Sequence, residues 1–571
     1  MQKFRRGLPG ARSRPPDLLW TSVWAISALS HEQVKVFSAF GNTTHRSARP
    51  RKASSINPRA GDLASGRNDI RILSMTNIQL PDVSVTMALV ASLQANLPDF
   101  GRIVDQFGHP APALRQLGLV HWENGRFDTA ARTFEAALSL RPEDPDLWRD
   151  LASVYSASDR DEQALAAIRK SLEVNPHSAQ SWQTLASVAD RLDDVEAAEG
   201  AYRRTIALNP KAAAAHLGLG LLLFRRKSYA EALAAVRMSV DLDPVNGLAH
   251  FALGHLSLIA SDFAGCARAF DEAARLTLPL DPPTRQKRAR ALTFQAMIEG
   301  RVQEALQNYG QIAGEDREDL DVIVRDAFSV LSASGHLEAA AEIGRMRLAE
   351  KPDDPVRRYL LDAVLGRSMT AAPTEYIERY FDQFAPRFDS KLLETLQYNA
   401  PSRMAKLVAG HRTDFKQMLD LGCGTGLAAG ELLPFGQPLI GVDLSSGMLA
   451  EAAKRGGYTE LVKSEAIAYL ETTPNRFDLI FAADSLIYFG ELGPLMRAVA
   501  EAMVQGGLFA LSIEVAAREG FTLQPSGRFA HSLDYLKAMA ADFVIMEAVE
   551  GNIRLEAGRP VSGLYVLMER R

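Results

Sequence analysis

The sequence predicts a multidomain protein in which an all-α array of helical repeats is followed by an α/β domain with a mostly parallel sheet. Three observations predict this. Prolines recur every 34 residues in the first half of the chain, this period stops near residue 370, and a glycine-rich turn then follows an apolar strand-like run. A chain of 571 residues with 47% apolar composition is also too long for one core, so at least two globular units are expected.

The repeat is visible in prolines and tryptophans that keep one interval: Pro142, Pro176, Pro210 and Pro244, with Trp148 and Trp182. Each unit also places large and small side chains in a fixed order on two helices, as in Trp148, Leu151, Ala152, Tyr155, Ala164 and Ile168. Small residues at two positions allow the paired helices to approach closely, and the proline ends the second helix because it cannot continue one.

This arrangement resembles the tetratricopeptide repeat, a 34-residue helix–turn–helix unit. We expect five repeats from 111 to 280 and two degenerate ones up to Pro352, about seven in all. Stacked repeats form a concave groove, so the resemblance implies a protein or peptide partner, while a spacer or a dimerisation device stays open. Four histidines without acidic or thiolate companions are expected to pack rather than bind metal: His121, His216, His250 and His255.

The C-terminal segment contains a strand, turn and helix pattern at 415–433. Gly422, Gly424 and Gly426 permit a sharp turn and a close backbone approach to a ligand at the carboxyl end of the strand. The next strand-like run ends in Asp443, 17 residues after Gly426, where a carboxylate can accept hydrogen bonds from ribose hydroxyls. This is the first half of a nucleotide-binding βαβ unit.

More strand-like runs follow. The third ends in Glu465, the fourth carries Asp484, the fifth follows Gly506 and Gly507, and the last two are joined by a turn at 557–560. Alternating strands and helices predict a mostly parallel sheet covered by helices, and the closing hairpin predicts an antiparallel edge.

The run DLGCGTG, from Asp420 to Gly426, differs from the GxGxxG spacing of dinucleotide dehydrogenases. It resembles the first motif of class I S-adenosylmethionine-dependent methyltransferases, which have a Rossmann-like fold. The resemblance implies S-adenosyl-L-methionine as cofactor, with Asp420 near its methionine amino group, Asp443 and Leu444 at the ribose, and Glu465 and Ala466 beside the adenine. The other implied cofactor-binding residues are Gly422, Cys423, Gly424, Thr425, Gly426 and Asp484.

The likeness covers 374–571 and is sharper than the general class. The stretches YIERYFDQFAPRFD, VDLSSGMLAEA, ADSLIYFGEL and LQPSGRFAHS resemble those of bacterial methyltransferases that carry tetratricopeptide repeats. This likeness implies the architecture and the cofactor, and it leaves the methyl acceptor unknown.

In-line methyl transfer depends mainly on positioning and desolvation, so no catalytic triad is required. An oxygen or nitrogen acceptor can also need a base, and the candidates are Asp484, Tyr488 and His531. His531 would titrate near neutral pH, but it could equally cap the helix that begins near Ser532.

Other residues of this segment have two interpretations each. Four aromatic residues with helical spacing predict either core packing or a lid over the cofactor: Tyr376, Tyr380, Phe384 and Phe388. Arg528 suits either an anionic acceptor or a surface salt bridge. Cys423 has no paired base nearby, so we expect a small side chain in the turn and not a nucleophile.

Composition restricts the classes of function. Residues 1–73 hold 13 Lys or Arg against 4 Asp or Glu, and the remainder holds 51 against 65. An acidic body argues against nucleic acid as partner. Two distant cysteines, Cys266 and Cys423, build neither a disulfide framework nor a thiolate metal site, which favours a cytoplasmic location. The apolar run 18–29 is too short for a membrane span.

We therefore expect three segments: a basic tail, disordered or assigned from too early a start, with a leading helix at 1–105, a repeat array at 106–370 and a methyltransferase domain at 371–571. A targeting signal remains an alternative for the tail. The predicted function is an S-adenosylmethionine-dependent methyltransferase whose array recruits a protein partner or substrate. Two other functions stay open: a scaffold with a cofactor-binding but non-catalytic domain, and an NAD-dependent oxidoreductase.

Overall fold

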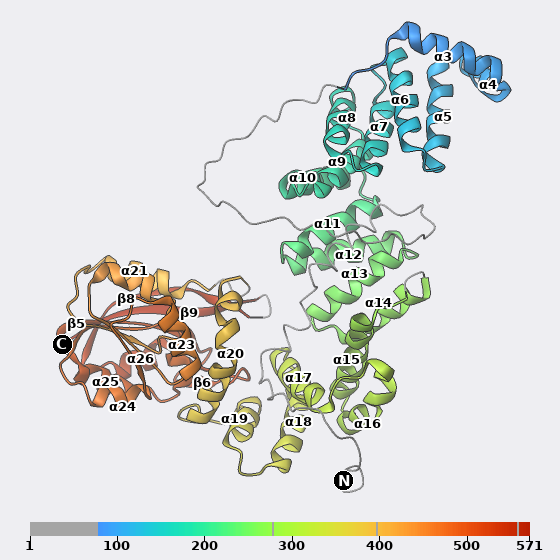
Figure 1. Ribbon diagram of the computed structural model, residues 1–571. Helices are drawn as coiled ribbons and strands as arrows, with labels where there is room; N and C mark the ends of the chain where they lie inside the picture. The colour runs from blue at the N-terminus through green and yellow to red at the C-terminus, as the bar shows by residue number, and fades with distance from the viewer. Residues whose placement is uncertain (1–77, 277–278, 395–397, 557–558) are drawn as a thin grey trace. The chain divides into compact units, whose positions relative to one another are not determined.

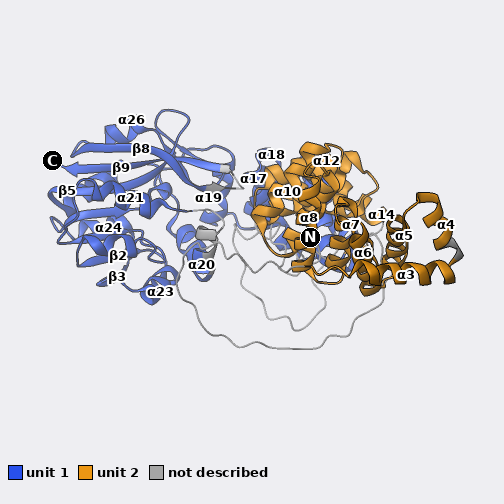
Figure 2. Ribbon diagram, turned by 90° about the horizontal axis from the view of Figure 1, so that it is seen from above, with its two compact units in different colours: residues 1–27, 261–267, 281–571 blue, residues 28–260, 268–280 orange. Residues whose placement is uncertain are grey.

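The computed structural model describes residues 78–276, 279–394, 398–556 and 559–571 (Figure 1). Most of the predicted basic tail and the centre of the last predicted turn, 557–558, lie outside the described residues. The described chain forms two compact units (Figure 2): the first in chain order is 78–260 with 268–280, drawn in orange, and the second is 261–267 with 281–571, drawn in blue. The second unit contains the last helices of the array together with the α/β domain. The boundary expected at residue 370 therefore lies inside one compact unit.

The first unit is built from helices. They are α3 (Val83–Asn96), α4 (Pro98–Phe107), α5 (Pro110–Glu123), α6 (Phe127–Leu140), α7 (Pro145–Ala157), α8 (Asp161–Val174), α9 (Ala179–Arg191), α10 (Val195–Leu208), α11 (Ala213–Arg225), α12 (Tyr229–Leu242), α13 (Gly247–Ile259) and the later part of α14 (Phe263–Leu276). Helices α5–α14 form the five predicted antiparallel pairs. The expected leading helix is two helices, since Pro98 begins α4 after the extended Leu97.

Small residues bring the two helices of a repeat together, as the pattern predicts. A β-carbon on Gly118 would lie 2.7 Å from the ring of Phe134, and one on Gly254 would lie 2.6 Å from the ring of Phe270. Both rings are fully buried. Glycine at this position therefore makes room for the aromatic side chain sixteen residues later on the partner helix.

The repeat prolines have a second role, because each offers a carbonyl oxygen to the next helix. Trp148 and Trp182 donate from Nε1 to the carbonyl oxygens of Pro142 and Pro176, at 2.7 and 2.8 Å. In the following repeats the donor is histidine: the Nε2 atoms of His216 and His250 lie 3.0 and 2.9 Å from the carbonyl oxygens of Pro210 and Pro244.

The repeat histidines therefore differ from one another. His216 and His250 are half-buried and replace tryptophan as the donor at this position. His255 is buried against the rings of Phe251 and Phe270 and packs in the core as expected. The described residues contain no cluster of histidine, cysteine and acidic side chains arranged to hold a metal ion.

The second unit begins with the two degenerate repeats and one further helix: α15 (Pro282–Ile298), α16 (Val302–Ala313), α17 (Leu320–Ala333), α18 (Leu337–Glu350) and α19 (Pro355–Val364). The helices of the α/β domain are α20 (Thr374–Glu394), α21 (Ala400–Ala409), α22 (Ala429–Leu432), α23 (Ser446–Arg455), α24 (Ala466–Glu471), α25 (Gly493–Ala502) and α26 (Leu533–Met539). Its strands are β1 (Met418–Leu421), β2 (Leu439–Asp443), β3 (Glu460–Lys463), β4 (Phe477–Ala482), β5 (Met503–Val515), β6 (Phe521–Leu523), β7 (Phe529–His531), β8 (Phe543–Glu556) and β9 (Arg559–Arg570).

The sheet has the predicted mostly parallel core. Strands β3, β2, β1, β4 and β5 are parallel neighbours in that order, and β9 pairs antiparallel with both β5 and β8. Successive side chains of a strand point to opposite faces of the sheet, so they pack in different hydrophobic cores. Leu419 and Leu421 pack with α24, α25 and α26, while Met418 packs with α21 and α22. Helices thus cover both faces of the sheet, and the carboxyl ends of β1, β2 and β4 share one edge.

Two elements differ from the prediction. The fourth strand-like run, 477–490, is divided into β4 and a 3₁₀ turn η3 (Leu486–Tyr488), because the chain turns away from the sheet through Asp484 at φ 56°. A short hairpin, β6–β7, follows β5, and β7 pairs in parallel with the end of β5. Among the described helices, none combines the length and the apolar content needed to cross a bilayer.

Candidate functional site

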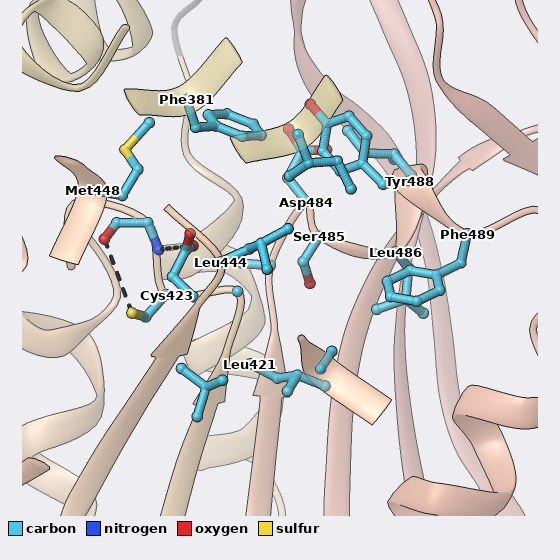
Figure 3. Close-up of a pocket in the computed structure, with 18 of the residues that line it drawn as sticks. Phe381, Leu421, Cys423, Leu444, Met448, Asp484, Ser485, Leu486, Tyr488 and Phe489 are labelled. Carbon is cyan, nitrogen blue, oxygen red and sulfur yellow. Dashed lines mark hydrogen bonds between the residues drawn. The ribbon is translucent and has the colours of Figure 1, made fainter. Parts of the chain in front are cut away.

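A cavity of about 620 Å³ opens at the carboxyl ends of β1, β2 and β4. Open α/β sheets bind ligands at this edge. Figure 3 shows Cys423 and Met448 on one side of the pocket and Asp484 and Tyr488 on the other, with Phe381 above. The two sides hold different groups.

The glycine turn forms the floor of the first side. The backbone amides of Gly422 and Cys423 donate to the carbonyl oxygen of Val442, at 2.8 and 3.0 Å, which joins the turn to β2. Gly422, Gly424 and Gly426 all have positive φ, at 77°, 55° and 81°, a region that favours glycine. A β-carbon on Gly422 would lie 2.5 Å from that of Ser485.

The rest of the turn follows the prediction in part. Cys423, Gly424 and Thr425 line the cavity, but Gly426 does not, because it faces the Tyr458 ring and Ala452 of α23. Burial raises the pKa of the Cys423 thiol well above its usual value, so this thiol stays protonated. Its place in the turn fits a small packing side chain.

Asp443 ends β2 and lines the cavity. Its Oδ2 atom accepts a hydrogen bond from the Gly424 amide at 2.9 Å, and its Oδ1 atom accepts one from the Ser445 amide at 2.8 Å. Burial raises the pKa of Asp443, and the backbone donors oppose that rise. The two amides fix the orientation of a carboxylate at the position where a ribose-binding acid is expected.

Asp420 lies at the end of β1 and is only 2% exposed. Its Oδ2 atom accepts a hydrogen bond from the Tyr458 hydroxyl at 2.6 Å. Burial raises the pKa of Asp420 to about 7, although the hydrogen bond from Tyr458 lowers it. A cation bound beside this carboxyl would favour the ionised form.

The remaining residues implied for the cofactor also line the cavity: Leu444, Glu465, Ala466 and Asp484. Glu465 is the N-cap of α24, because its Oε2 atom accepts a hydrogen bond from the Ala468 amide at 2.9 Å. The structure thus brings together every residue of the predicted cofactor set except Gly426.

Helix α20 covers the cavity from the side opposite the sheet. Tyr380, Phe381, Phe384 and Phe388 line the cavity, whereas Tyr376 is buried against Tyr359 of α19. Tyr376 therefore packs, as one interpretation predicts, and the later rings line the cavity, where the second interpretation stays a prediction.

Two acids of α20 attach the helix to the loops below it. Asp382 accepts hydrogen bonds from the Ser445 hydroxyl at 2.6 Å and from the Gly447 amide at 2.8 Å, at the start of α23. Asp389 accepts one from the Thr425 hydroxyl and pairs with Arg455. Helix α20 is therefore bonded to the glycine turn and to the helix after β2.

The second side of the cavity contains two arginines with different partners. The Arg554 guanidinium is 4% exposed and pairs with Asp484, both of whose carboxylate oxygens lie 2.9 Å from Nη1, and with the buried Glu514. Arg528 is 8% exposed and hydrogen-bonds to Tyr488. Burial raises the pKa of Tyr488, so the phenol keeps its proton near neutral pH and does not serve as a base.

His531 does not reach the cavity, and neither of its predicted roles fits the structure. The ring is buried, and Nε2 lies 2.8 and 3.2 Å from the carbonyl oxygens of Phe489 and Gly490. Carbonyls only accept, so Nε2 carries the proton, and burial lowers the pKa of His531 to about 4. The cap of α26 is Ser532, whose hydroxyl accepts a hydrogen bond from the Tyr535 amide at 3.2 Å.

Several residues of the site were not predicted. Tyr458 and Tyr398 lie in loops and Arg554 lies on β8, and no local pattern marks them as site residues. The link between α19 and α20 also lines the cavity: the Ala372 amide donates to the Tyr488 carbonyl, and the Thr370 carbonyl accepts from the Gly490 amide, both at 2.9 Å. The change of pattern at 370 marked this link only as a boundary.

The sheet order, the glycine turn and the acid at the end of β2 define a class I methyltransferase domain, and the paired helices before it define tetratricopeptide repeats. Models of tetratricopeptide repeat families match residues 121–188 and 184–247, and a methyltransferase domain model matches residues 419–511. The chain therefore combines tetratricopeptide repeats with a class I methyltransferase domain.

Known proteins are similar to parts of the chain. A probable S-adenosylmethionine-dependent methyltransferase of Saccharomyces cerevisiae is 30% identical over an alignment of 135 residues that covers 21% of this chain. The chain spans 45% of the length of that relative. Among solved structures, MamA is similar to part of the chain at 23% identity. The match covers 28% of this chain and 92% of MamA, with a TM-score of 0.26. The structure of an S-adenosylmethionine-dependent methyltransferase from Mesorhizobium loti is 20% identical, and the match covers 30% of this chain and 98% of that one with a TM-score of 0.25.

Proposed function

We propose that the protein is an S-adenosylmethionine-dependent methyltransferase. One observation carries the proposal: the glycine turn, Asp420 and Asp443 meet in a single cavity, which helix α20 covers. The residues present suit the cofactor. The turn leaves no room for a β-carbon at Gly422, Asp443 offers a fixed carboxylate, and Asp420 offers a buried carboxyl that a cation would ionise.

In this proposal Asp420 holds the amino group of the cofactor, Asp443 the ribose hydroxyls, and Glu465 and Ala466 lie beside the adenine. When bound, S-adenosylmethionine would supply an electrophilic methyl group and leave as S-adenosylhomocysteine, and the acceptor would supply the lone pair and give up its proton to a base or to water. The rings of Phe381, Phe384 and Tyr380 exclude water and face a cation favourably.

The other side of the cavity would receive the acceptor. Tyr488 retains its proton and is suited to donate a hydrogen bond to the acceptor. Of the predicted bases that line the cavity, Asp484 is the one proposed to accept a proton, and Arg554 fixes its orientation. Most of the acceleration would come from positioning.

Titration calorimetry with S-adenosylmethionine tests the proposal. The wild-type protein should bind, and Asp443→Ala should bind at least about tenfold more weakly, because a hydrogen-bonding carboxylate is lost. Asp542→Ala, an exposed acid remote from the cavity lining, is the matched control and should bind as the wild type does. Absence of binding by the wild-type protein would end the proposal.

A scaffold with a non-catalytic domain would bind the cofactor without using it. Formation of S-adenosylhomocysteine in the presence of a cell extract separates the two functions, since the enzyme should form it and the scaffold should not. The oxidoreductase alternative has less support. Dinucleotide-binding sheets of the Rossmann type continue from the fifth strand to a sixth in the order 3-2-1-4-5-6, whereas here the antiparallel β9 lies next to β5.

We further propose that the repeat array recruits a protein or peptide partner through its concave surface. A pull-down with the full chain should capture a protein that a variant altered in the groove does not. If the captured protein is itself methylated, the array delivers the substrate. Equal capture by both proteins would contradict recruitment through the groove.

A further inference from the structure

The side of the cavity away from the glycine turn has balanced charge. Its ionic side chains that are shielded from water are two acids, Asp484 and Glu514, and two arginines, Arg528 and Arg554. Glu491 also lines the cavity, but it is exposed, so solvent screens its charge. A charged ligand would lose its hydration here without meeting an excess of the opposite charge. The balance therefore favours an uncharged ligand.

Asp484 is held at this side in a backbone conformation that side-chain-bearing residues seldom adopt. Its φ is 56°, and its amide donates to the buried Ser512 hydroxyl at 2.8 Å. Both of its carboxylate oxygens lie 2.9 Å from Nη1 of Arg554. A carboxylate offers about four lone-pair sites, so the pair with Arg554 leaves room for a further donor. Backbone outliers of this kind cluster at functional sites.

Tyr488 is the second polar group on this side, and Figure 3 shows it beside Asp484. Tyr488 is hydrogen-bonded to Arg528, and a guanidinium only donates, so the phenol oxygen accepts this bond and keeps its own proton for another partner. The wall around them is apolar, with the Phe381 ring in edge contact with Tyr488 at a centroid distance of 5.6 Å and Leu495 also in the lining. One acceptor and one donor thus lie together in an apolar wall.

An uncharged hydroxyl group matches this pair. It has one donor and two acceptor lone pairs, so it can donate to Asp484 while it accepts from Tyr488. A carboxylate cannot donate, and an ammonium group cannot accept and has no lone pair to methylate. An apolar wall with a few polar groups suits a carbon-rich body whose orientation those groups fix.

We propose that the methyl acceptor is an uncharged hydroxyl compound with an apolar body, such as a phenol, whose O–H group binds between Asp484 and Tyr488. This inference rests on the proposed function and adds the chemical class of the acceptor. Asp484 accepts the hydroxyl proton as the acceptor oxygen bonds to the methyl carbon, and the electron pair of the broken carbon–sulfur bond stays on sulfur. Tyr488 keeps its proton and positions the oxygen.

Binding of four small probes to the full chain saturated with S-adenosylhomocysteine tests this. Phenol carries the hydroxyl, toluene has a similar shape without it, and benzoate and benzylammonium carry opposite charges. Calorimetry should show that phenol binds at least about tenfold more tightly than each of the others, because it alone satisfies both polar groups. Equal or tighter binding of toluene, benzoate or benzylammonium would overturn the inference, and so would the absence of phenol binding.

Tyr488→Phe separates recognition of the hydroxyl from apolar packing. It should lower the affinity for phenol about fivefold, because one hydrogen bond is lost, and should not lower the affinity for toluene. The matched control is Tyr309→Phe, which removes from α16 a hydroxyl that accepts from the Glu318 amide at 3.0 Å, and it should leave all four affinities unchanged. Unchanged phenol binding in a folded Tyr488→Phe would contradict the assignment.

Binding of S-adenosylhomocysteine by Tyr488→Phe shows that the variant folds. If it fails to fold, the preference of the wild type for phenol over the other three probes remains a complete test. Failure of the wild type to bind S-adenosylhomocysteine would instead refute the proposed function.

Discussion

Asp420 is buried at the end of β1 with its carboxyl hydrogen-bonded to Tyr458. Its pKa of about 7 means that the carboxyl is about half protonated at neutral pH. A cationic ligand group at this position would bind the ionised form, so cofactor binding and loss of a proton from Asp420 are coupled.

The affinity for S-adenosylhomocysteine should therefore rise with pH. From about pH 6 to about pH 7.5 the ionised fraction of a group with a pKa near 7 rises about eightfold, while most of an α-amino group stays protonated. Calorimetry in buffers of different ionisation enthalpy should show that a proton is released. Asp420→Asn should bind more weakly and lose this part of the pH dependence; the same slope in the variant would contradict the assignment.

The same raised pKa affects folding. Between the usual value of 3.8 and the folded value of about 7, the folded protein keeps a proton that the unfolded chain has lost. The free energy of unfolding therefore decreases as pH rises through this window. Thermal melts without ligand should show Asp420→Asn gaining stability relative to the wild type between about pH 4 and about pH 7. A pH-independent difference would contradict the burial argument.

Substitution of Gly422 tests how closely the glycine turn approaches Ser485. Alanine at φ 77° with its β-carbon 2.5 Å from that of Ser485 should cost about 1–3 kcal/mol of stability and weaken cofactor binding. Gly430→Ala is the control, because α22 offers open space at that position. Denaturant unfolding and calorimetry measure both effects, and equal behaviour of the two variants would count against a tight turn.

Residues of the site differ in how far sequence could predict them. The glycine turn and Asp443 follow from local patterns, because a turn after a strand and an acid after the next strand must meet at one edge of a parallel sheet. His531 looked like a base because histidine titrates near neutral pH, and its burial depended on a hairpin that the pattern did not show. Tyr458 and Arg554 reach the site through tertiary packing alone.

At the scale of elements, the repeat pairs depend on small residues facing large ones. Gly254→Ala would place a β-carbon 2.6 Å from the Phe270 ring and should destabilise the protein by about 1–3 kcal/mol. Gly200→Ala meets no atom within 4 Å in a helix interior and should stabilise it by up to about 1 kcal/mol. Denaturant unfolding measures both, and a loss of stability in Gly200→Ala would contradict the assignment.

Elements with a strong period were predictable. Five helix pairs follow from the 34-residue interval, and the sheet follows from alternating apolar runs with a closing hairpin. The β6–β7 hairpin was not predictable. Its strands have three residues each, and runs this short show no alternation of apolar and polar residues. The end of β4 was misplaced because the apolar run continues into the 3₁₀ turn after Asp484.

At the scale of the whole molecule, the last helices of the array and the methyltransferase domain are joined through the turn at 524–528 and the link at 370–372. Tyr359 is buried in α19 and its hydroxyl bonds to the Gly527 carbonyl. The array therefore contributes to the wall of the cavity, and the pattern change near residue 370 separates two sequence types rather than two independent bodies.

Tyr359→Phe should cost about 1 kcal/mol of stability, as loss of one buried hydrogen bond does, and should leave cofactor affinity unchanged. Tyr565→Phe removes a similar bond, to the Asn552 carbonyl at 2.9 Å, within the sheet, and should affect stability alone. Parallel melts and calorimetry compare the two. Wild-type stability in Tyr359→Phe would contradict the contact between α19 and the turn at 524–528.

A crystal structure of the chain grown with S-adenosylhomocysteine tests whether the glycine turn, Asp420 and Asp443 form the cofactor site. We expect density for the ligand in the cavity at the ends of β1 and β2, with its ribose hydroxyls at Asp443 and its amino group at Asp420. An empty cavity at saturating ligand, or ligand bound elsewhere on the chain, would contradict it.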